Sequence, residues 1–294
     1  MTRLIQTFAE IAARYETLLC DLWGCLHNGK AAFPAAVLAL QGFRESGGHV
    51  VLLTNAPRPN SFVAAQLARL GVPSDAFDTI VTSGDAAQAA LFSGAVGRRV
   101  YHLGPKKDLG FFEQVPAGFA GAEPILRVSL DEAEGIVCTG LFDDQTETPE
   151  DYRGIFPAAK TRGLKLLCAN PDLAVDLGDK RIYCGGALAA LYEEMGGESL
   201  YFGKPHPPIY DLARRRVAEL TGRAPDSDKT LAIGDGIRTD ILGGIGEGID
   251  TLFVTGGLES ARFGPDAQSP DARKLDGWLR GLQLSPTYSI GNFR

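Results

Sequence analysis

Short apolar runs alternate with longer amphipathic segments along most of this chain of 294 residues. The clearest runs are apolar at nearly every position and predict strands at residues 17–20, 50–53, 79–83, 230–234 and 251–254. Helices are predicted between them, such as the segment from Pro34 to Phe43, which has proline in its first turn and Gly47 beyond its end. Strands that are nearly all apolar and alternate with helices predict a parallel, doubly wound α/β sheet covered on both faces.

The middle of the chain does not simply continue this alternation, and it contains further predicted strands and helices of its own. Further strands are predicted at residues 99–104, 135–140 and 165–169. A helix is expected near residues 151–161. A helix at residues 186–188 is expected to return the chain to the core, and a strand at 199–202 is expected to join the first sheet. Residues 4–12 fit a short amphipathic helix, whereas the tail after Gly257 gives only a loop-rich pattern. A chain of this length has room for two compact units, or for one core with a large insertion.

Composition narrows the class of protein. The chain is 45% hydrophobic, which is typical of a soluble globular enzyme, and its net charge of −7 is spread without long runs of one sign. No basic footprint for nucleic acid, no membrane-spanning apolar stretch and no signal-peptide core are evident. The five cysteines lack paired metal-ligand spacing, so buried free thiols in a reducing, cytoplasmic compartment are expected.

Polar residues stand where the predicted strands of the first sheet end. Asp21, Thr54 with Asn55, and Asp235 each come directly after one of the apolar runs. Lys204 stands between a glycine and a proline, in a turn with a restricted backbone. In an open α/β sheet, ligands bind outside the carboxyl ends of the strands, so these residues are candidates for function. Together they provide the groups that a phosphoryl-transfer site needs.

The order of these residues resembles the haloacid dehalogenase (HAD) superfamily. The matching motifs are Asp21-x-x-Gly24, Leu53-Thr54-Asn55, Gly203-Lys204-Pro205 and Gly234-Asp235-x-x-x-Thr239-Asp240. Two further segments, at residues 168–172 and 184–190, resemble the class IIA branch, the p-nitrophenylphosphatase-like sugar and nucleotide phosphatases. The likeness spans about residues 17–257, and the joint order and spacing of the motifs make it specific.

This resemblance implies a Rossmann-like core with a large inserted α/β cap domain. The core would comprise residues 1–85 and 183–294, and the cap residues 86–182. The resemblance also implies a Mg²⁺-dependent phosphatase that acts on a small phosphorylated metabolite, such as a sugar phosphate, a nucleotide, or an aryl or acyl phosphate. Caps of this class often pair, so a homodimer is compatible with it. No nucleic acid or membrane partner is expected.

The resemblance assigns the nucleophile and the metal ligands. Asp21 is the nucleophile, which forms an aspartyl-phosphate. Mg²⁺ is held by Asp21, Asp235 and the backbone carbonyl of Trp23, because a hard cation prefers oxygen ligands. Asp240 is either a further carboxylate at the metal or a partner of a helix N-terminus.

The phosphate contacts follow from the same resemblance. Thr54 and Asn55 offer a hydroxyl and an amide to phosphate oxygens, although an Asx turn would explain Asn55 alone. Lys204 offers a compact positive charge that neutralises Asp21 and the transferring phosphoryl group.

Trp23 departs from the family pattern, which has an aspartate two residues after the nucleophile. That aspartate protonates the leaving oxygen and then activates water, and such help is worth about 10²–10⁴ in rate. Indole has one N–H donor and no accessible acid pKa, so Trp23 cannot act in its place. An enzyme without this acid should favour leaving groups that depart as stable anions. Trp23 could instead stack on a ring of the substrate.

Several alternatives stay open on sequence alone. A phosphoryl-ligand binding or regulatory protein with weakened catalysis would keep the same motifs. A hydrolase of carbon–halogen or carbon–phosphorus bonds is disfavoured, because dehalogenation needs no metal and no Schiff-base lysine can be placed. His27 and His206 lie next to the site loops and are candidate proton donors. Cys25 lies near Asp21, but no histidine partner is indicated for it.

Overall fold

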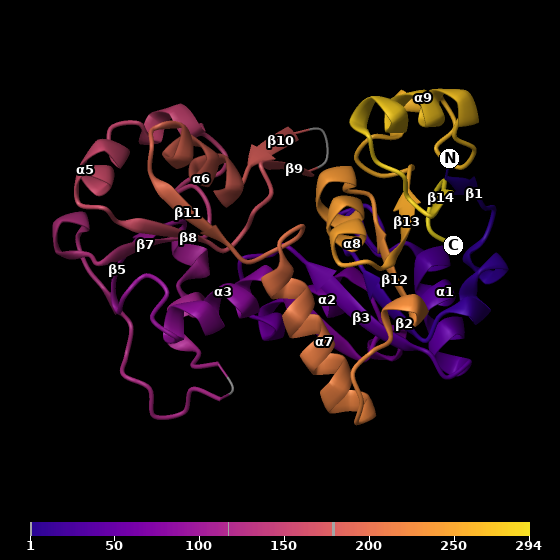
Figure 1. Cartoon of the computed structure of the whole chain (residues 1–294), viewed down its shortest axis with the longest axis horizontal. Coiled ribbons are helices and arrows are strands. Elements are labelled where there is room, and N and C mark those ends of the chain that lie inside the picture. The colour runs from indigo at the N-terminus through magenta and orange to yellow at the C-terminus, as the bar shows by residue number, and fades with distance from the viewer. Residues whose placement is uncertain (1, 117, 178–179) are drawn as a thin grey trace. The chain divides into compact units, whose positions relative to one another are not determined.

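The computed structural model describes residues 2–116, 118–177 and 180–294 (Figure 1). These residues form two compact units. The first comprises Met1–Thr54, Ala64–Val81 and Tyr210–Arg294, and the second comprises Asn55–Val63 and Thr82–Ile209. The chain crosses between the units more than once, and each unit has its own parallel sheet.

A seven-stranded sheet forms the centre of the first unit. In spatial order its strands are β1 (Arg3–Leu4), β14 (Tyr288–Ile290), β13 (Asp250–Val254), β12 (Thr230–Gly234), β2 (Thr17–Cys20), β3 (His49–Thr54) and β4 (Thr79–Thr82). The pairs from β1 to β3 are all parallel. Strands β2 and β12 are buried at every position, as expected for the middle of a sheet covered on both faces. The predicted parallel α/β sheet is confirmed.

Helices lie between these strands along the chain, as the pattern predicts. They are α1 (Pro34–Glu45), α2 (Asn60–Leu70), α7 (Pro207–Thr221), α8 (Leu242–Gly246) and α9 (Ala272–Leu282). Helix α1 begins at the expected proline, whose fixed φ and missing N–H suit a first turn. It buries Val37, Leu40 and Phe43, which lie three residues apart in succession and therefore share one face.

Both ends of the chain differ from the expectation. The amphipathic helix expected at residues 4–12 is replaced by strand β1 and two 3-10 turns. The tail after Gly257 also contains regular structure, because β14 pairs between β1 and β13 and helix α9 follows the loop. Leu275 and Leu279 of α9 pack in a cluster with Phe253 of β13. Local periodicity does not reveal which distant segments will pair, so the pattern missed these elements.

A five-stranded sheet forms the centre of the second unit. In spatial order its strands are β11 (Glu198–Tyr201), β8 (Lys165–Cys168), β7 (Gly135–Cys138), β5 (Arg99–Leu103) and β6 (Leu126–Arg127), all paired in parallel. A separate antiparallel pair joins β9 (Ala174–Leu177) to β10 (Lys180–Tyr183). The helices are α3 (Ser83–Phe92), α4 (Gly110–Glu113), α5 (Phe156–Thr161) and α6 (Gly185–Glu194).

Two details of the second unit correct the expectation. The helix expected at residues 151–161 is split into a 3-10 turn (Pro149–Tyr152) and α5, because Gly154 and Pro157 interrupt it. The strand expected at 199–202 does not join the first sheet, since β11 pairs with β8. Periodicity identifies a strand but not the sheet that it joins. The helix at 186–188, expected to return the chain to the core, is part of α6, and α6 lies in the second unit. The cap boundaries at residues 86 and 182 stay a prediction.

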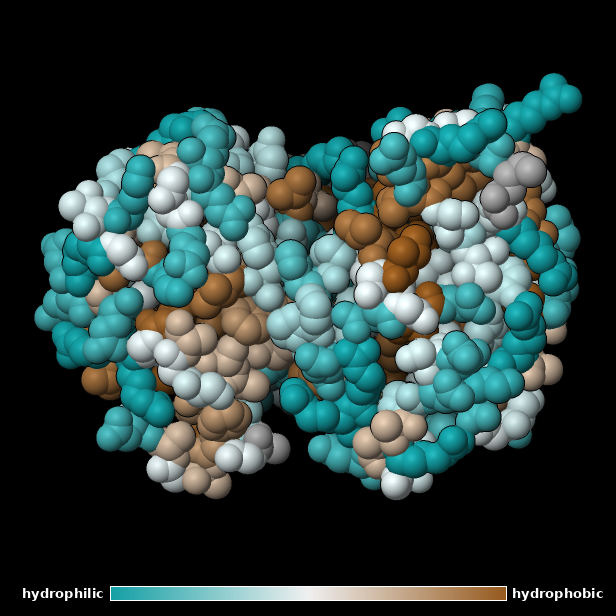
Figure 2. Space-filling view, in the orientation of Figure 1, coloured by the Kyte–Doolittle hydropathy of each residue, from teal (hydrophilic) through white to brown (hydrophobic). Residues whose placement is uncertain are grey.

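The surface of the face drawn in Figure 2 is mostly polar, with a strip of apolar side chains over α8. Leu242 and Ile245 of this helix are 39% and 40% exposed. Within the described ranges, no helix combines the length and the apolar character that crossing a membrane requires.

Candidate active site

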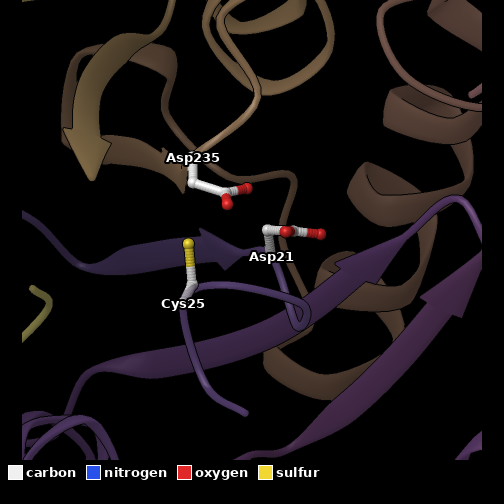
Figure 3. A group of neighbouring side chains, drawn as sticks. All are labelled: Asp21, Cys25 and Asp235. Atoms are coloured by element: carbon white, nitrogen blue, oxygen red, sulfur yellow. The ribbon is translucent and has the colours of Figure 1, made fainter. Parts of the chain in front are cut away.

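Two carboxylates of the first unit lie together at the carboxyl ends of neighbouring strands. Asp21 follows β2, and Asp235 follows β12. These strands are paired in parallel with Cys20 opposite Ile233, and the Asp21 N–H donates to the Ile233 carbonyl at 2.8 Å. Both aspartates are 8% exposed. Figure 3 shows their carboxylates at the same edge, with the thiol of Cys25 close by.

This group fits a divalent cation. One potential ligand atom from each of Asp21, Cys25 and Asp235 lies within 4.8 Å of the other two. Two buried carboxylates this close repel each other, and a cation bound between them removes the repulsion. A hard cation such as Mg²⁺ is held through carboxylate oxygens with water and phosphate completing the shell. The predicted Mg²⁺ ligands Asp21 and Asp235 are therefore brought together, whereas the Trp23 carbonyl stays a predicted ligand.

Two glycines allow the backbone to close around Asp235. A Cβ at Gly24 would lie 2.0 Å from the Asp235 Oδ2 atom, and a Cβ at Gly257 would lie 2.1 Å from it. Gly24 also has a φ of +77°, which disfavours other residues. The Leu258 N–H donates to the same oxygen at 2.8 Å. The Asp235 carboxylate is therefore fixed by contacts on several sides.

Cys25 is buried beside the two carboxylates without being suited to nucleophilic attack. Burial raises the pKa of its thiol well above the usual value, and the charges of Asp235 and Asp21 raise that pKa further. The thiolate is the nucleophilic form of cysteine, so a thiol held protonated is inert. Burial of the protonated thiol therefore gives no support to Cys25 as a nucleophile.

Asp240 lies in the π-helical turn (Ile237–Ile241) that follows β12. Its Oδ2 atom accepts hydrogen bonds from the Gly236 N–H at 3.1 Å and from the Thr239 hydroxyl at 3.3 Å. A Cβ at Gly234 would lie 2.0 Å from the Asp240 Cγ atom. Among the described residues, the group of side chains that could hold a metal ion does not include Asp240. These contacts favour a role in shaping the turn, and its place at the metal stays a prediction.

Trp23 is half-buried and packs within its own turn. Its ring centroid lies 5.4 Å from that of His27 at an interplanar angle of 74°. A Cβ at Gly29 would lie 2.5 Å from the Trp23 Cη2 atom, and Gly29 has a φ of +80°. Glycine at position 29 therefore lets the loop pass close to the indole.

Neither candidate histidine has the character of a proton donor. Burial lowers the pKa of His27 to about 4, and its Nδ1 atom accepts the Gly29 N–H at 3.0 Å. His27 is therefore a neutral imidazole at pH 7. In the second unit, His206 stacks on Tyr201 with ring centroids 4.8 Å apart, and burial lowers its pKa as well.

The second unit contains Asn55 and Lys204 side by side. The Lys204 N–H donates to Asn55 Oδ1 at 2.7 Å, and Asn55 Nδ2 donates to the Lys204 carbonyl at 3.0 Å. Asn55 Nδ2 also donates to Asp172 Oδ1 at 2.8 Å. Thr54, at the end of β3 in the first unit, stays a predicted phosphate ligand.

Sequence reasoning missed two parts of this arrangement. In the sequence, Asp172 stands out only as part of a family-like segment, and its residue type alone predicts no role. The sequence gives no role to Gly257 and Leu258, whose backbone lies against Asp235, because Gly257 ends the family-like region and Leu258 begins the loop-rich tail. The position of Gly257 just after the apolar run of β13 was the available signal, because ligand-binding loops follow such strands.

Comparisons with known proteins agree with this architecture. A sequence model of the haloacid dehalogenase-like hydrolase family matches residues 18–116, and a HAD-hydrolase-like model matches residues 201–274. A haloacid dehalogenase-like hydrolase from Brucella suis 1330 is 38% identical in its crystal structure, with a TM-score of 0.84 over 99% of this chain and 100% of that chain.

Two curated bacterial proteins are more distant relatives. Ribonucleotide monophosphatase NagD of Escherichia coli K12 is 27% identical over 89% of this chain and 98% of its own length. 5'-nucleotidase YutF of Bacillus subtilis 168 is 26% identical over 89% of this chain and 95% of its own length. With the core sheet, the second sheet and the Brucella relative in agreement, the chain belongs to the haloacid dehalogenase-like hydrolase family, in the class IIA branch that carries an α/β cap.

Proposed function

We propose that this protein is a Mg²⁺-dependent phosphatase that forms an aspartyl-phosphate on Asp21 and acts on a small phosphorylated metabolite. The observation that carries the proposal is the buried pair of Asp21 and Asp235, whose oxygens lie within 4.8 Å at the ends of adjacent parallel strands. The names of the two curated relatives, a ribonucleotide monophosphatase and a 5'-nucleotidase, support phosphate monoesters as the substrate class.

In the proposed reaction, an oxygen of Asp21 attacks the phosphorus of the substrate. The new bond joins the carboxylate to phosphorus while the ester bond to the leaving group breaks, and water later cleaves the acyl-phosphate to release inorganic phosphate. Bound Mg²⁺ supplies positive charge for the phosphoryl oxygens, and Asp21, Asp235 and the Trp23 carbonyl would hold it. Lys204 and Thr54 are assigned to the phosphoryl group by the order of the family motifs.

We further propose that Trp23 stands where relatives have their acid–base aspartate. The indole carries no titratable proton, and the neighbouring His27 has a pKa of about 4 and is neutral at pH 7. The described residues of this turn therefore offer no general acid near neutral pH. Because charge develops on the leaving oxygen, aryl and acyl phosphates should react well and alkyl phosphates slowly.

The same observation favours a second candidate function. If water attack on the acyl-phosphate is also slow without a base, the protein would retain the phosphoryl group and act as a binding or regulatory member of the family. The two candidates differ in whether phosphate is released over many turnovers.

A screen of phosphate esters tests the proposal. Aryl, acyl and alkyl phosphates are incubated with and without Mg²⁺, and released phosphate is measured for wild type, Trp23→Asp and Trp23→Phe. We expect Mg²⁺-dependent release from aryl phosphates, and a gain on alkyl phosphates of up to about 10²–10⁴ in Trp23→Asp alone. Phosphate retained in a single turnover, with no further release, would favour the binding protein. Turnover at the same rate with and without Mg²⁺ would contradict the assignment of Asp235 as a metal ligand.

A further inference from the structure

We propose that Asn55, held by Asp172, is a positioning residue that fixes the backbone of Lys204, and that its side chain does not bind phosphate. This inference rests on the proposed function, in which Lys204 supplies the charge for the phosphoryl group. It replaces the phosphate contact that the motif order suggested for the Asn55 amide.

The Asn55 amide pairs with both polar groups of the Lys204 backbone. Oδ1 accepts the Lys204 N–H at 2.7 Å, and Nδ2 donates to the Lys204 carbonyl at 3.0 Å. Asn55 is 4% exposed and Lys204 is 2% exposed. In such a buried place, loss of one partner leaves a polar backbone group without a hydrogen bond. The pairing therefore fixes both ends of the Lys204 residue.

The second proton of Nδ2 is also engaged. It is donated to Asp172 Oδ1 at 2.8 Å. A primary amide has two N–H donors, and the oxygen of the amide can only accept. Phosphate oxygens that are ionised also only accept. The Asn55 side chain therefore has no donor left for a phosphate, although it stands at the family's phosphate-binding position.

The surroundings leave this pairing little freedom. A Cβ at Gly203 would lie 2.4 Å from Asn55 Oδ1 and 2.6 Å from Ser83 Oγ, so the residue before Lys204 must be glycine. Asp172 is itself fixed, since its N–H donates to Asn170 Oδ1 at 3.0 Å and its carbonyl accepts the Gly186 N–H at 3.1 Å. The start of α6, the Asp172 segment and the Lys204 turn thus form one connected network.

The network matters because lysine has a long and flexible side chain. A fixed backbone reduces the positions that the ammonium group samples. Misplacement of a catalytic group by about 1 Å can lower the rate about 10²-fold. Fixing the Lys204 backbone is therefore a direct way to place its charge.

A double-mutant cycle tests the inference. We measure kcat and KM on an aryl phosphate for Asn55→Ala, Lys204→Met and the double variant. We expect Asn55→Ala to lower kcat by about 10²-fold with a smaller change in KM, and to have almost no further effect in the Lys204→Met background. A full and independent effect of Asn55→Ala in that background would overturn the inference, because a direct phosphate contact does not need Lys204.

Asp172 provides a matched pair of variants outside the Lys204 turn. Asp172→Asn keeps an oxygen that can accept the Asn55 amide proton, whereas Asp172→Ala removes it. We expect Asp172→Ala to lower kcat several-fold and Asp172→Asn to retain most of it. Equal losses of kcat in the two variants would contradict the role of Asp172 in holding Asn55, since only Asp172→Ala removes the acceptor.

Hydrogen exchange separates failure of this inference from failure of the proposed function. The Lys204 N–H should exchange slowly in the wild type and faster in Asn55→Ala, measured by mass spectrometry on the peptide that contains Lys204. This readout needs no turnover. An unchanged exchange rate would overturn the positioning role, even in a protein with full activity. If Lys204 N–H exchange is faster in Asn55→Ala but the wild type hydrolyses no phosphate ester, the positioning role of Asn55 stands and the proposed phosphatase function is refuted.

Discussion

Substitution of Gly24 by alanine separates backbone strain from loss of the metal site. Gly24 has a φ of +77°, and its missing Cβ faces the Asp235 Oδ2 atom at 2.0 Å. Gly222 provides a matched control, because it has the same φ of +77° and nothing lies within 4 Å of the position where its Cβ would be. Both variants carry the same left-handed strain, so any difference between them reports the contact with Asp235.

The expected magnitudes follow from these two positions. An alanine in the left-handed region costs about 1–2 kcal/mol, so both variants should lose this much free energy of unfolding. In Gly24→Ala the Asp235 carboxylate must also move by about 1 Å, against its bond to the Leu258 N–H and the close approach of Gly257. We therefore expect turnover to fall about 10²-fold in Gly24→Ala and to stay near wild type in Gly222→Ala.

Urea unfolding gives the free energies, and initial rates over a series of Mg²⁺ concentrations give the activity. Gly24→Ala should also need more Mg²⁺ for half-maximal rate, since one of the two carboxylates that we propose as ligands of the ion is displaced. Equal activity in the two variants, whether both keep it or both lose it, would refute the reasoning.

Three further predictions address single groups of the site. Removal of Mg²⁺ with a chelator should abolish turnover, and Asp235→Asn should raise the Mg²⁺ concentration needed to restore it; restoration at the wild-type concentration would speak against Asp235 as a ligand. Cys25→Ser should keep turnover near wild type because the thiol pKa is raised and the thiol stays protonated, so a loss beyond about 10²-fold in the initial rate would reopen a role for sulfur. The folded-state pKa of His27 is about 4, below the value of 6.5 for an unperturbed histidine. Between these two pH values the unfolded chain therefore binds more protons than the folded chain. The free energy of unfolding should fall by about 3 kcal/mol as the pH drops from 6.5 to 4. In urea unfolding at a series of pH values, His27→Asn should make this fall smaller. It should not remove the fall entirely, because burial also lowers the pKa of His102 to about 4. An unchanged slope of unfolding free energy against pH would show that His27 is not buried as described.

The sequence predicted the parts of the fold that depend on local pattern. The strands that end before Asp21 and Asp235 are apolar at nearly every position, and such runs identify buried parallel strands whose carboxyl ends gather polar groups. Helix α1 was predicted well, because proline and glycine mark its limits. The meeting of the two carboxylates was expected because both aspartates follow predicted strands of one sheet and match motifs of one family.

Other features depend on tertiary contacts that a local pattern does not contain. Strand β11 looks like a core strand in sequence, yet its partner is β8. Asn55 looks like a phosphate ligand, yet its amide is occupied by the Lys204 backbone, which is 149 residues away in sequence. The need for glycine at position 257 is evident only in the folded chain, where Asp235 lies against it. In each case the residue type was informative, but its partner was set by the folded chain.

The most direct test of the account is to find where the phosphoryl group is attached. Wild-type protein is mixed with an aryl phosphate and Mg²⁺, quenched in acid, and digested for peptide mass spectrometry, with Asp21→Asn treated in parallel. The account predicts phosphate on the Asp21 side chain in the wild type, and neither phosphate nor turnover in Asp21→Asn. Phosphate attached to another residue, or release at the wild-type rate by Asp21→Asn, would contradict it.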